Sequence, residues 1–149
     1  NLQAQRPIEI ALNASRHPAR MHLMARARFG TIIPIREMAS PEAALEKART
    51  GNAIALIEIG EGDWWAGLRD DSELAIIDGL LGEGGRGSAL AVGRLSPDRL
   101  GEDRSFAVLE QAELATRLGR GEAVCPIAVS GSLNLCVIER VAPLSRAAA

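Results

Sequence analysis

The chain has 149 residues, a length that suits one ordinary domain with a hydrophobic core of its own. Its net charge of −2 gives no electrostatic footprint for nucleic acid or an anionic membrane, and an aromatic content of 3% argues against stacking on bases. Apolar residues make up 47% without a run of the roughly 20 that cross a membrane, and no signal peptide opens the chain, so we expect a globular cytoplasmic protein.

The first predicted elements are a strand and a helix joined by a polar loop. Residues 7–12, PIEIAL, are typical of a short strand, and a helix is predicted over residues 17–29. Asn13 or Ser15 can cap this helix, which would direct its first N–H groups and the positive end of its dipole to the top of the sheet. The loop is therefore a candidate contact for an anionic group.

This helix carries a basic run beside its apolar residues. Leu23, Met24 and Ala27 are expected to face the core, with Met21 as a further candidate. Arg16, His17 and Arg20 lie near the start of the helix, where they could meet an anionic ligand. A solvated helix face is the alternative interpretation of the basic residues.

A second strand is predicted over residues 31–38, TIIPIREM, with Pro34 inside it. Proline cannot donate to a strand ladder, so this strand either lies at a sheet edge or bends at the proline. Strands and helices then alternate over residues 1–60 as β-α-β-α-β. Parallel pairing with right-handed crossovers follows from that order.

Residues 40–59, SPEAALEKARTGNAIALIEI, give the best-defined helix and strand of the chain. Ser40 is a good N-cap followed by proline at the first helical position, and Gly51 stands where a left-handed C-cap residue is favoured. The run AIALIEI then suits a central parallel strand that is buried on both faces. Glu58 lies near the carboxyl end of this strand, where α/β sheets bind their ligands.

Beyond residue 60 the connections become hairpin-like, which predicts antiparallel strands. Trp64 and Trp65 lie on a short helical turn; one of them packs inward while the other covers a cleft mouth, or both cap the edge of the core. We therefore expect an α/β fold, a three-layer βαβαβ unit with a mixed sheet and antiparallel strands in the second half. The predicted elements of that half are strands at residues 74–81, 88–95, 105–110, 124–129 and 133–141, and a helix at residues 112–118.

No catalytic motif stands out by spacing. The chain lacks G-x-S-x-G, H-E-x-x-H, C-x-x-C and a dinucleotide fingerprint, and we expect neither a metal nor a cofactor. Cys125 and Cys136 fall on neighbouring predicted strands and are interpreted as two buried free thiols rather than a disulfide. The polar loop of residues 98–104 either is a simple hairpin loop or converges with the first loop and Glu58 at an anion site.

Three stretches resemble the prephenate dehydratase domain. Residues 40–59 are similar to its helix of the form x-x-A-x-x-x-G and to the strand that ends in its Pro-Ile-Glu-Asn-Ser motif; Ile57 and Glu58 keep that motif. The stretch IEIALNASRHPA resembles the first strand and the Gly-Thr-Phe-Ser-His-x-Ala loop, with His17 on the histidine position. The stretch EDRSFAVLE resembles the strand with the Thr-Arg-Phe motif, in which Phe106 matches.

The resemblance implies a fold, a setting and a site. The family domain is a two-lobed cleft of the type II periplasmic-binding kind, and here residues 60–88 are too few for a complete second lobe. Such domains often follow a chorismate mutase domain and precede a phenylalanine-sensing ACT domain. Residues 1–60 would then form the dehydratase-like half, and residues 61–149 would complete the same domain with an ACT-like βαββ segment at the C-terminus.

Three hypotheses follow. The first is a degenerate prephenate dehydratase-like domain, ligand-binding or regulatory, in aromatic amino-acid biosynthesis, without catalysis of its own. It would bind a small carboxylate such as prephenate or phenylalanine. The second is an active but atypical dehydratase, and the third is a scaffold without a ligand that forms a homodimer. The candidate ligand-binding residues are Asn13, Ser15, Arg16, His17, Glu58 and Phe106, and the candidate catalytic residues are Arg104 and Ser105.

Overall fold

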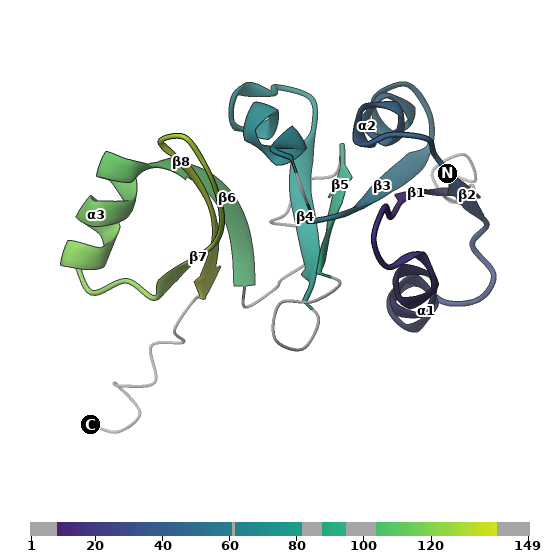
Figure 1. The fold of residues 1–149 in the computed structure, drawn as a ribbon, viewed down its shortest axis with the longest axis horizontal. Helices are drawn as coiled ribbons and strands as arrows, with labels where there is room; N and C mark the ends of the chain where they lie inside the picture. The colour runs from purple at the N-terminus through teal and green to yellow at the C-terminus, as the bar shows by residue number, and fades with distance from the viewer. Residues whose placement is uncertain (1–8, 61, 82–87, 95–103, 140–149) are drawn as a thin grey trace, which may run out of the picture.

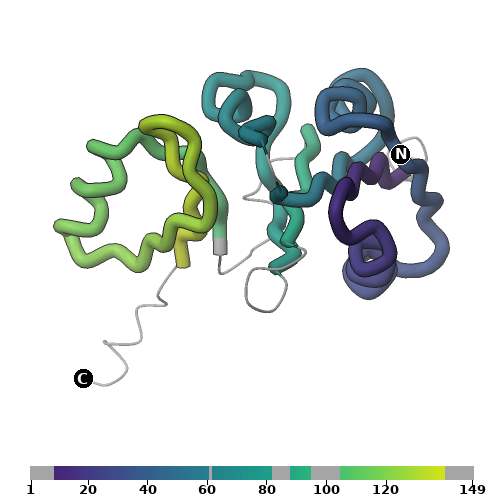
Figure 2. Tube along the Cα trace, viewed as in Figure 1, coloured from purple at the N-terminus to yellow at the C-terminus, as the bar shows by residue number. Residues whose placement is uncertain are grey.

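The computed structural model describes residues 9–60, 62–81, 88–94 and 104–139, which form two β-sheets with helices packed against them (Figure 1). In the Cα trace of Figure 2, the segments that form the five-stranded sheet run from purple to teal-green, and those that form the three-stranded sheet run from green to yellow. The elements in chain order are β1 (Glu9–Asn13), α1 (Pro18–Phe29), β2 (Ile35–Glu37), α2 (Pro41–Thr50), β3 (Ala53–Glu58), the 3₁₀ helix η2 (Trp64–Asp70), β4 (Ala75–Leu80), β5 (Ala89–Gly93), β6 (Arg104–Glu110), α3 (Gln111–Gly119), β7 (Val124–Ser130) and β8 (Leu133–Glu139).

The first sheet has the strand order β2-β1-β3-β5-β4. Strands β1, β2 and β3 are parallel, and β5 runs antiparallel to both β3 and β4. The sequence prediction of an α/β fold with parallel strands first and antiparallel strands later is confirmed. The edge position expected for the proline-containing segment is also confirmed, because β2 begins directly after Pro34 and lies at the edge of this sheet.

Two helices cover opposite faces of the five-stranded sheet, and alternation along the strands decides which residues meet each helix. Ala44 and Ala48 of α2 pack in one apolar cluster with Ala11 and Ala55. Met21 and Ala25 of α1 pack in a second cluster with the alternate residues of the same two strands, which include Ile10, Leu12, Ile54 and Leu56. All six residues of β3 are buried, as the apolar run predicted. Figure 1 shows α2 above and α1 below the sheet.

Two local predictions about the helices are wrong. Gly51 has a φ of −122° and is therefore extended rather than left-handed, although its N–H still closes α2 on the carbonyl of Lys47. Leu23 is 72% exposed and Ala27 is also exposed. Met21, which was also a core candidate, is buried together with Ala25, and Met24 is partly buried against the same cluster, so α1 is rotated relative to the predicted stripe.

The strands of the second half of the chain are divided between two sheets, whereas one mixed sheet was expected. Strands β4 and β5 complete the first sheet, whereas β6, β8 and β7 form a separate antiparallel sheet in that spatial order. One face of the second sheet packs on α3 through Leu109, Leu114 and Cys136. Its other face contributes Val108 and Leu135 to the cluster that contains α2. The observed β6-α3-β7-β8 order is the βαββ arrangement expected for this segment.

The tryptophan pair and the cysteines divide between core and surface. Trp65 is 1% exposed and packs in the cluster shared by the two sheets, whereas Trp64 is half-buried and its indole N–H donates to the carbonyl oxygen of Glu58 at 3.3 Å. Cys136 is buried but Cys125 is exposed, so the expectation of two buried thiols is wrong for Cys125, while both cysteines are free. No helix in the described part of the chain is long and apolar enough to cross a membrane.

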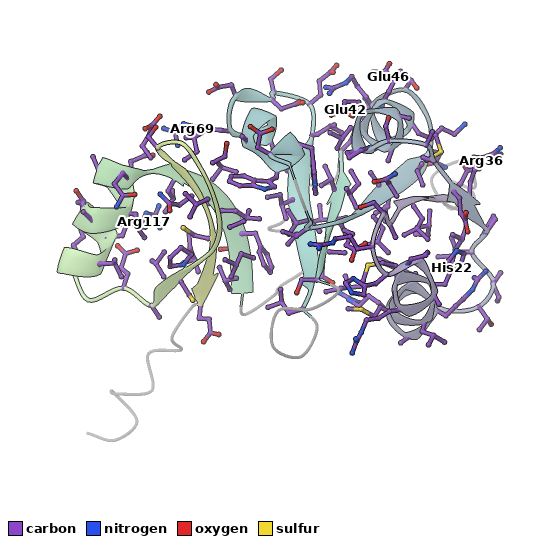
Figure 3. The ribbon with its side chains drawn as sticks, viewed as in Figure 1. His22, Arg36, Glu42, Glu46, Arg69 and Arg117 are labelled. Atoms are coloured by element: carbon purple, nitrogen blue, oxygen red, sulfur yellow. The ribbon has the colours of Figure 1, made fainter. Side chains whose placement is uncertain are left out.

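The two sheets meet where β4 lies beside β6. A Cβ atom added at Gly79 of β4 would lie less than 3.0 Å from three atoms of the Phe106 ring, so the ring occupies the space that glycine leaves. Nearby, the guanidinium of Arg69 on η2 donates to the Val108 carbonyl at 2.8 Å and to the Glu113 carboxylate at 2.7 Å. Figure 3 shows Arg69 between η2 and the three-stranded sheet.

Gly79→Ala is expected to destabilise the fold by about 2 kcal/mol, because the added methyl group overpacks the contact with Phe106. Urea unfolding measures this loss. Gly67→Ala is the matched control, since nothing lies within 4 Å of a Cβ at Gly67, and its effect is expected within about 0.5 kcal/mol. In a Phe106→Leu background the cost of Gly79→Ala is expected to shrink; equal costs in both backgrounds would contradict the contact.

Candidate functional site

The carboxylate of Glu58 lies at the carboxyl end of β3 and is the buried polar centre of the site. Strand pairing sets Asn13 of β1 beside Ile57, so the loop after β1 passes directly over this carboxylate. Glu58 Oε1 accepts the backbone N–H of Arg16 at 2.9 Å and that of His17 at 3.1 Å, and Oε2 contacts His17 Nδ1. Glu58 is 4% exposed, and both of its oxygens are therefore engaged within the chain.

These contacts replace the predicted helix cap. The N-cap of α1 is His17, so the prediction that Asn13 or Ser15 caps this helix is wrong. The Asn13 side chain instead donates to the Met38 carbonyl at 3.0 Å. A carboxylate from a distant strand satisfies the N–H groups at the entry to α1, where the helix dipole favours negative charge.

The environment of Glu58 also determines its charge. Burial alone would raise the pKa of Glu58, but the hydrogen bond with His17 and the N–H groups of Arg16 and His17 oppose it, and the pKa of Glu58 lies below its ordinary value. The side chain is therefore a carboxylate at neutral pH. Because its oxygens are occupied, it holds the loop in place and does not face a ligand.

A cavity of about 540 Å³ lies beside this loop, between the end of β3, η2 and β7. Its volume falls within the roughly 300–1,000 Å³ of small-molecule sites. One wall comes from the loops next to Glu58 and contains Arg16, Ile59, Gly60 and Gly62. Residues 127–129 of β7 form the facing wall, with Trp65, Leu81 and Ser88 between the two.

Arg16 is the one charged residue among the described residues that line this cavity. Its side chain runs against Gly60, where an added Cβ would meet Arg16 Cδ at 3.4 Å. A guanidinium presents two parallel N–H donors, the geometry that a carboxylate accepts. Ser88 adds a buried serine directly before β5 and near the end of β3, because Ala89 of β5 pairs with Glu58. The cavity thus combines a guanidinium and a serine with the apolar side chains of Ile59, Trp65 and Ile127.

The predicted site residues divide into two groups. Asn13, Ser15, Arg16, His17 and Glu58 lie together at the entry to α1, and only Arg16 among them lines the cavity. The second group consists of Arg104, Ser105 and Phe106, which lie on β6 and not at the entry to α1.

The residues of β6 face in other directions. Ser105 pairs with Ile138, which packs on the α3 side of the second sheet, whereas Phe106 points to the opposite side and covers Gly79. Neither lines the cavity. For Arg104 the structure describes the backbone, which pairs with Glu139. The rest of the predicted loop, residues 98–103, lies outside the described residues.

Sequence reasoning missed the facing wall. The sequence around Gly60, Gly62 and Trp65 indicated a turn next to a packed tryptophan, and these residues line the cavity. Residues 127–129 of β7 have the pattern of an ordinary short strand, and nothing in it indicates that they line a cavity. Among the residues that the structure describes, no group of three His, Cys, Asp or Glu side chains could hold a metal ion. Comparison of the chain with family models, curated proteins and solved structures found no match.

Glu58→Ala is expected to lower the free energy of unfolding by roughly 3 kcal/mol, because it leaves two N–H groups and His17 without their buried partner. Chemical denaturation measures this change. Glu37→Ala is the matched control, since Glu37 pairs with His22 on the exposed surface, and we expect a loss below about 1 kcal/mol. Figure 3 labels His22 on α1, on the side away from the three-stranded sheet. Similar losses at the two glutamates would contradict the role given to Glu58.

Acid is expected to remove the contribution of Glu58 to stability. The folded pKa of Glu58 lies below its ordinary value of 4.5, so the unfolded chain binds the proton more readily. The stabilisation is fully present above that ordinary value and is lost as the pH falls through the lowered pKa. Urea midpoints of the wild type and Glu58→Gln between pH 7 and pH 3 check this. The gap between them should narrow on acidification, and a constant gap would overturn the assignment.

Proposed function

We propose that this chain binds a small carboxylate in the cavity between its two sheets and acts as a ligand-binding or regulatory domain. The observation that carries the proposal is the cavity of about 540 Å³ in which Arg16 provides a guanidinium beside polar and apolar lining residues. Within the resemblance to a degenerate prephenate dehydratase domain, prephenate and phenylalanine are the ligands to test first. The setting is then aromatic amino-acid biosynthesis in the cytoplasm, in association with chorismate mutase.

The choice of binding over catalysis is supported by the positions of the ionisable groups. Dehydration needs a group that moves a proton at the substrate. The oxygens of Glu58 are engaged within the loop, and Ser105 lies on the α3 side of the second sheet. An atypical dehydratase therefore remains the second candidate, with Ser88 as the hydroxyl found among the described cavity residues.

The scaffold hypothesis has less support. Such a scaffold would dimerise through an exposed strand edge or through an apolar patch near Trp64 and Trp65, but Trp65 is 1% exposed and belongs to the core. The open edge at β2 has an exposed apolar neighbour, Ile32, at 90%. Two copies could pair through such an edge, so a homodimer is the alternative, and the molecular mass in solution would detect it.

Thermal unfolding with and without prephenate, chorismate and phenylalanine tests the proposal. A ligand at 100 times its Kd should stabilise the fold by about 2.7 kcal/mol, which raises Tm by several degrees in a domain of this size. Arg16→Ala should reduce the shift, because it removes the charged contact of the cavity. Arg20→Ala, on the exposed face of α1, is the control and should leave the shift unchanged. A shift that survives Arg16→Ala would contradict the site, and no shift with any ligand would favour the scaffold.

A further inference from the structure

A second cavity adjoins the first. It has a volume of about 380 Å³ and shares two wall residues, Leu81 and Ile127, with the cavity that contains Arg16. Strand β7 runs along both: residues 127–129 line the first cavity, and the start of the strand lines the second. The two cavities are therefore consecutive compartments along one strand, divided by a pair of apolar side chains.

The two compartments differ in chemistry. The first contains Arg16 and the buried Ser88. The second is lined by Ala123, Val124, Cys125 and the buried Val137, and Glu139 is its one charged residue among the described ones. Positive charge therefore stands at one end of the pair, apolar surface in the middle and negative charge at the far end.

Leu81, one of the two residues between the compartments, is partly exposed to solvent. Leu81 follows β4 and is 39% exposed, although it contributes to the walls of both compartments. Covering such an apolar side chain is favourable in proportion to the area removed from water. An apolar chain that passed Leu81 and Ile127 would gain that contact and enter the second compartment.

We propose that the ligand is an elongated amphipathic monocarboxylate whose carboxylate meets Arg16 and whose apolar tail occupies the second compartment. This inference rests on the proposed function and adds the shape and charge of the ligand. Val124 and Ala128 of β7 are four residues apart, so the part of the strand that lines the two compartments is about 13 Å long and favours an elongated ligand. Glu139 disfavours a second anionic group at the tail end by like-charge repulsion.

A series of ω-phenyl carboxylates tests the proposal. Phenylacetate, 4-phenylbutyrate and 6-phenylhexanoate carry the same two end groups on tails of increasing length, and calorimetry of the full chain gives their Kd values. Each buried methylene strengthens binding by up to about fourfold, so 6-phenylhexanoate should bind at least about tenfold more tightly than phenylacetate. Octanedioate, which ends in a second carboxylate, should bind more weakly than octanoate.

A substitution at the second compartment separates its role from that of the first. Ala123→Trp places an indole at the exposed rim of this compartment and should abolish the gain with tail length while leaving phenylacetate binding unchanged. Ala112→Trp, at an exposed position of α3 that lines neither cavity, is the matched control and should keep the length dependence. Thermal unfolding of each variant without ligand verifies that it is folded.

Cys125 offers a readout independent of affinity, because this exposed thiol lines the second compartment whereas Cys136 is buried. Saturating 6-phenylhexanoate should slow the alkylation of Cys125 by iodoacetamide about tenfold, since only the free fraction reacts, and phenylacetate should not. Cys125→Ser identifies the reacting thiol. Arg16-dependent binding of phenylacetate without length dependence or protection overturns this inference alone. Absence of binding by every member overturns this inference, and the proposed function is overturned as well only if prephenate, chorismate and phenylalanine also give no shift in Tm.

Discussion

The buried carboxylate of Glu58 is the interaction on which the candidate site depends. It joins the end of β3 to the N–H groups of Arg16 and His17, which precede it by 42 and 41 residues. A buried charge is stable in a protein only when hydrogen bonds and opposite charge compensate it. The loop after β1 is therefore fixed by the carboxylate, and with it the place where the Arg16 side chain enters the cavity. Glu58 is the most obvious candidate for a ligand contact in the sequence, but in the structure it positions the loop that carries Arg16 and does not line the cavity.

The first half of the fold was predictable because its signals are local. Ser40 accepts the N–H of Ala43 at 3.0 Å, as the capping pattern indicated, and the apolar run after Gly51 forms the buried strand β3. Parallel order then brings the end of β3 beside the loop after β1. The sequence could not show that Glu58 would serve this loop, because a carboxylate at the end of a strand suits a ligand and a neighbouring helix start equally well.

The second half depends on contacts that no local pattern contains. Alternation along β6 indicates that Ser105 and Phe106 face opposite sides, but only the pairing with β8 decides which side meets the first sheet. The same holds for the facing wall of the cavity, which comes from β7, about 70 residues after Glu58 in the chain. The resemblance predicted Ser105 as a catalytic residue from the order of the motifs along the chain. The direction in which the Ser105 side chain points depends instead on the pairing of β6 with β8 in a separate sheet.

The cluster of apolar side chains shared by the two sheets has a consequence for how the molecule can move. Trp65, Leu90, Val108 and Leu135 belong to this one cluster, although they come from η2, β5, β6 and β8. Rotation of one sheet away from the other would expose these side chains to water, at a free-energy cost proportional to their area. The two sheets are therefore expected to behave as one cooperative unit and not as a hinged pair, and the proposed ligand would enter a cavity whose shape already exists by displacing side chains at its rim.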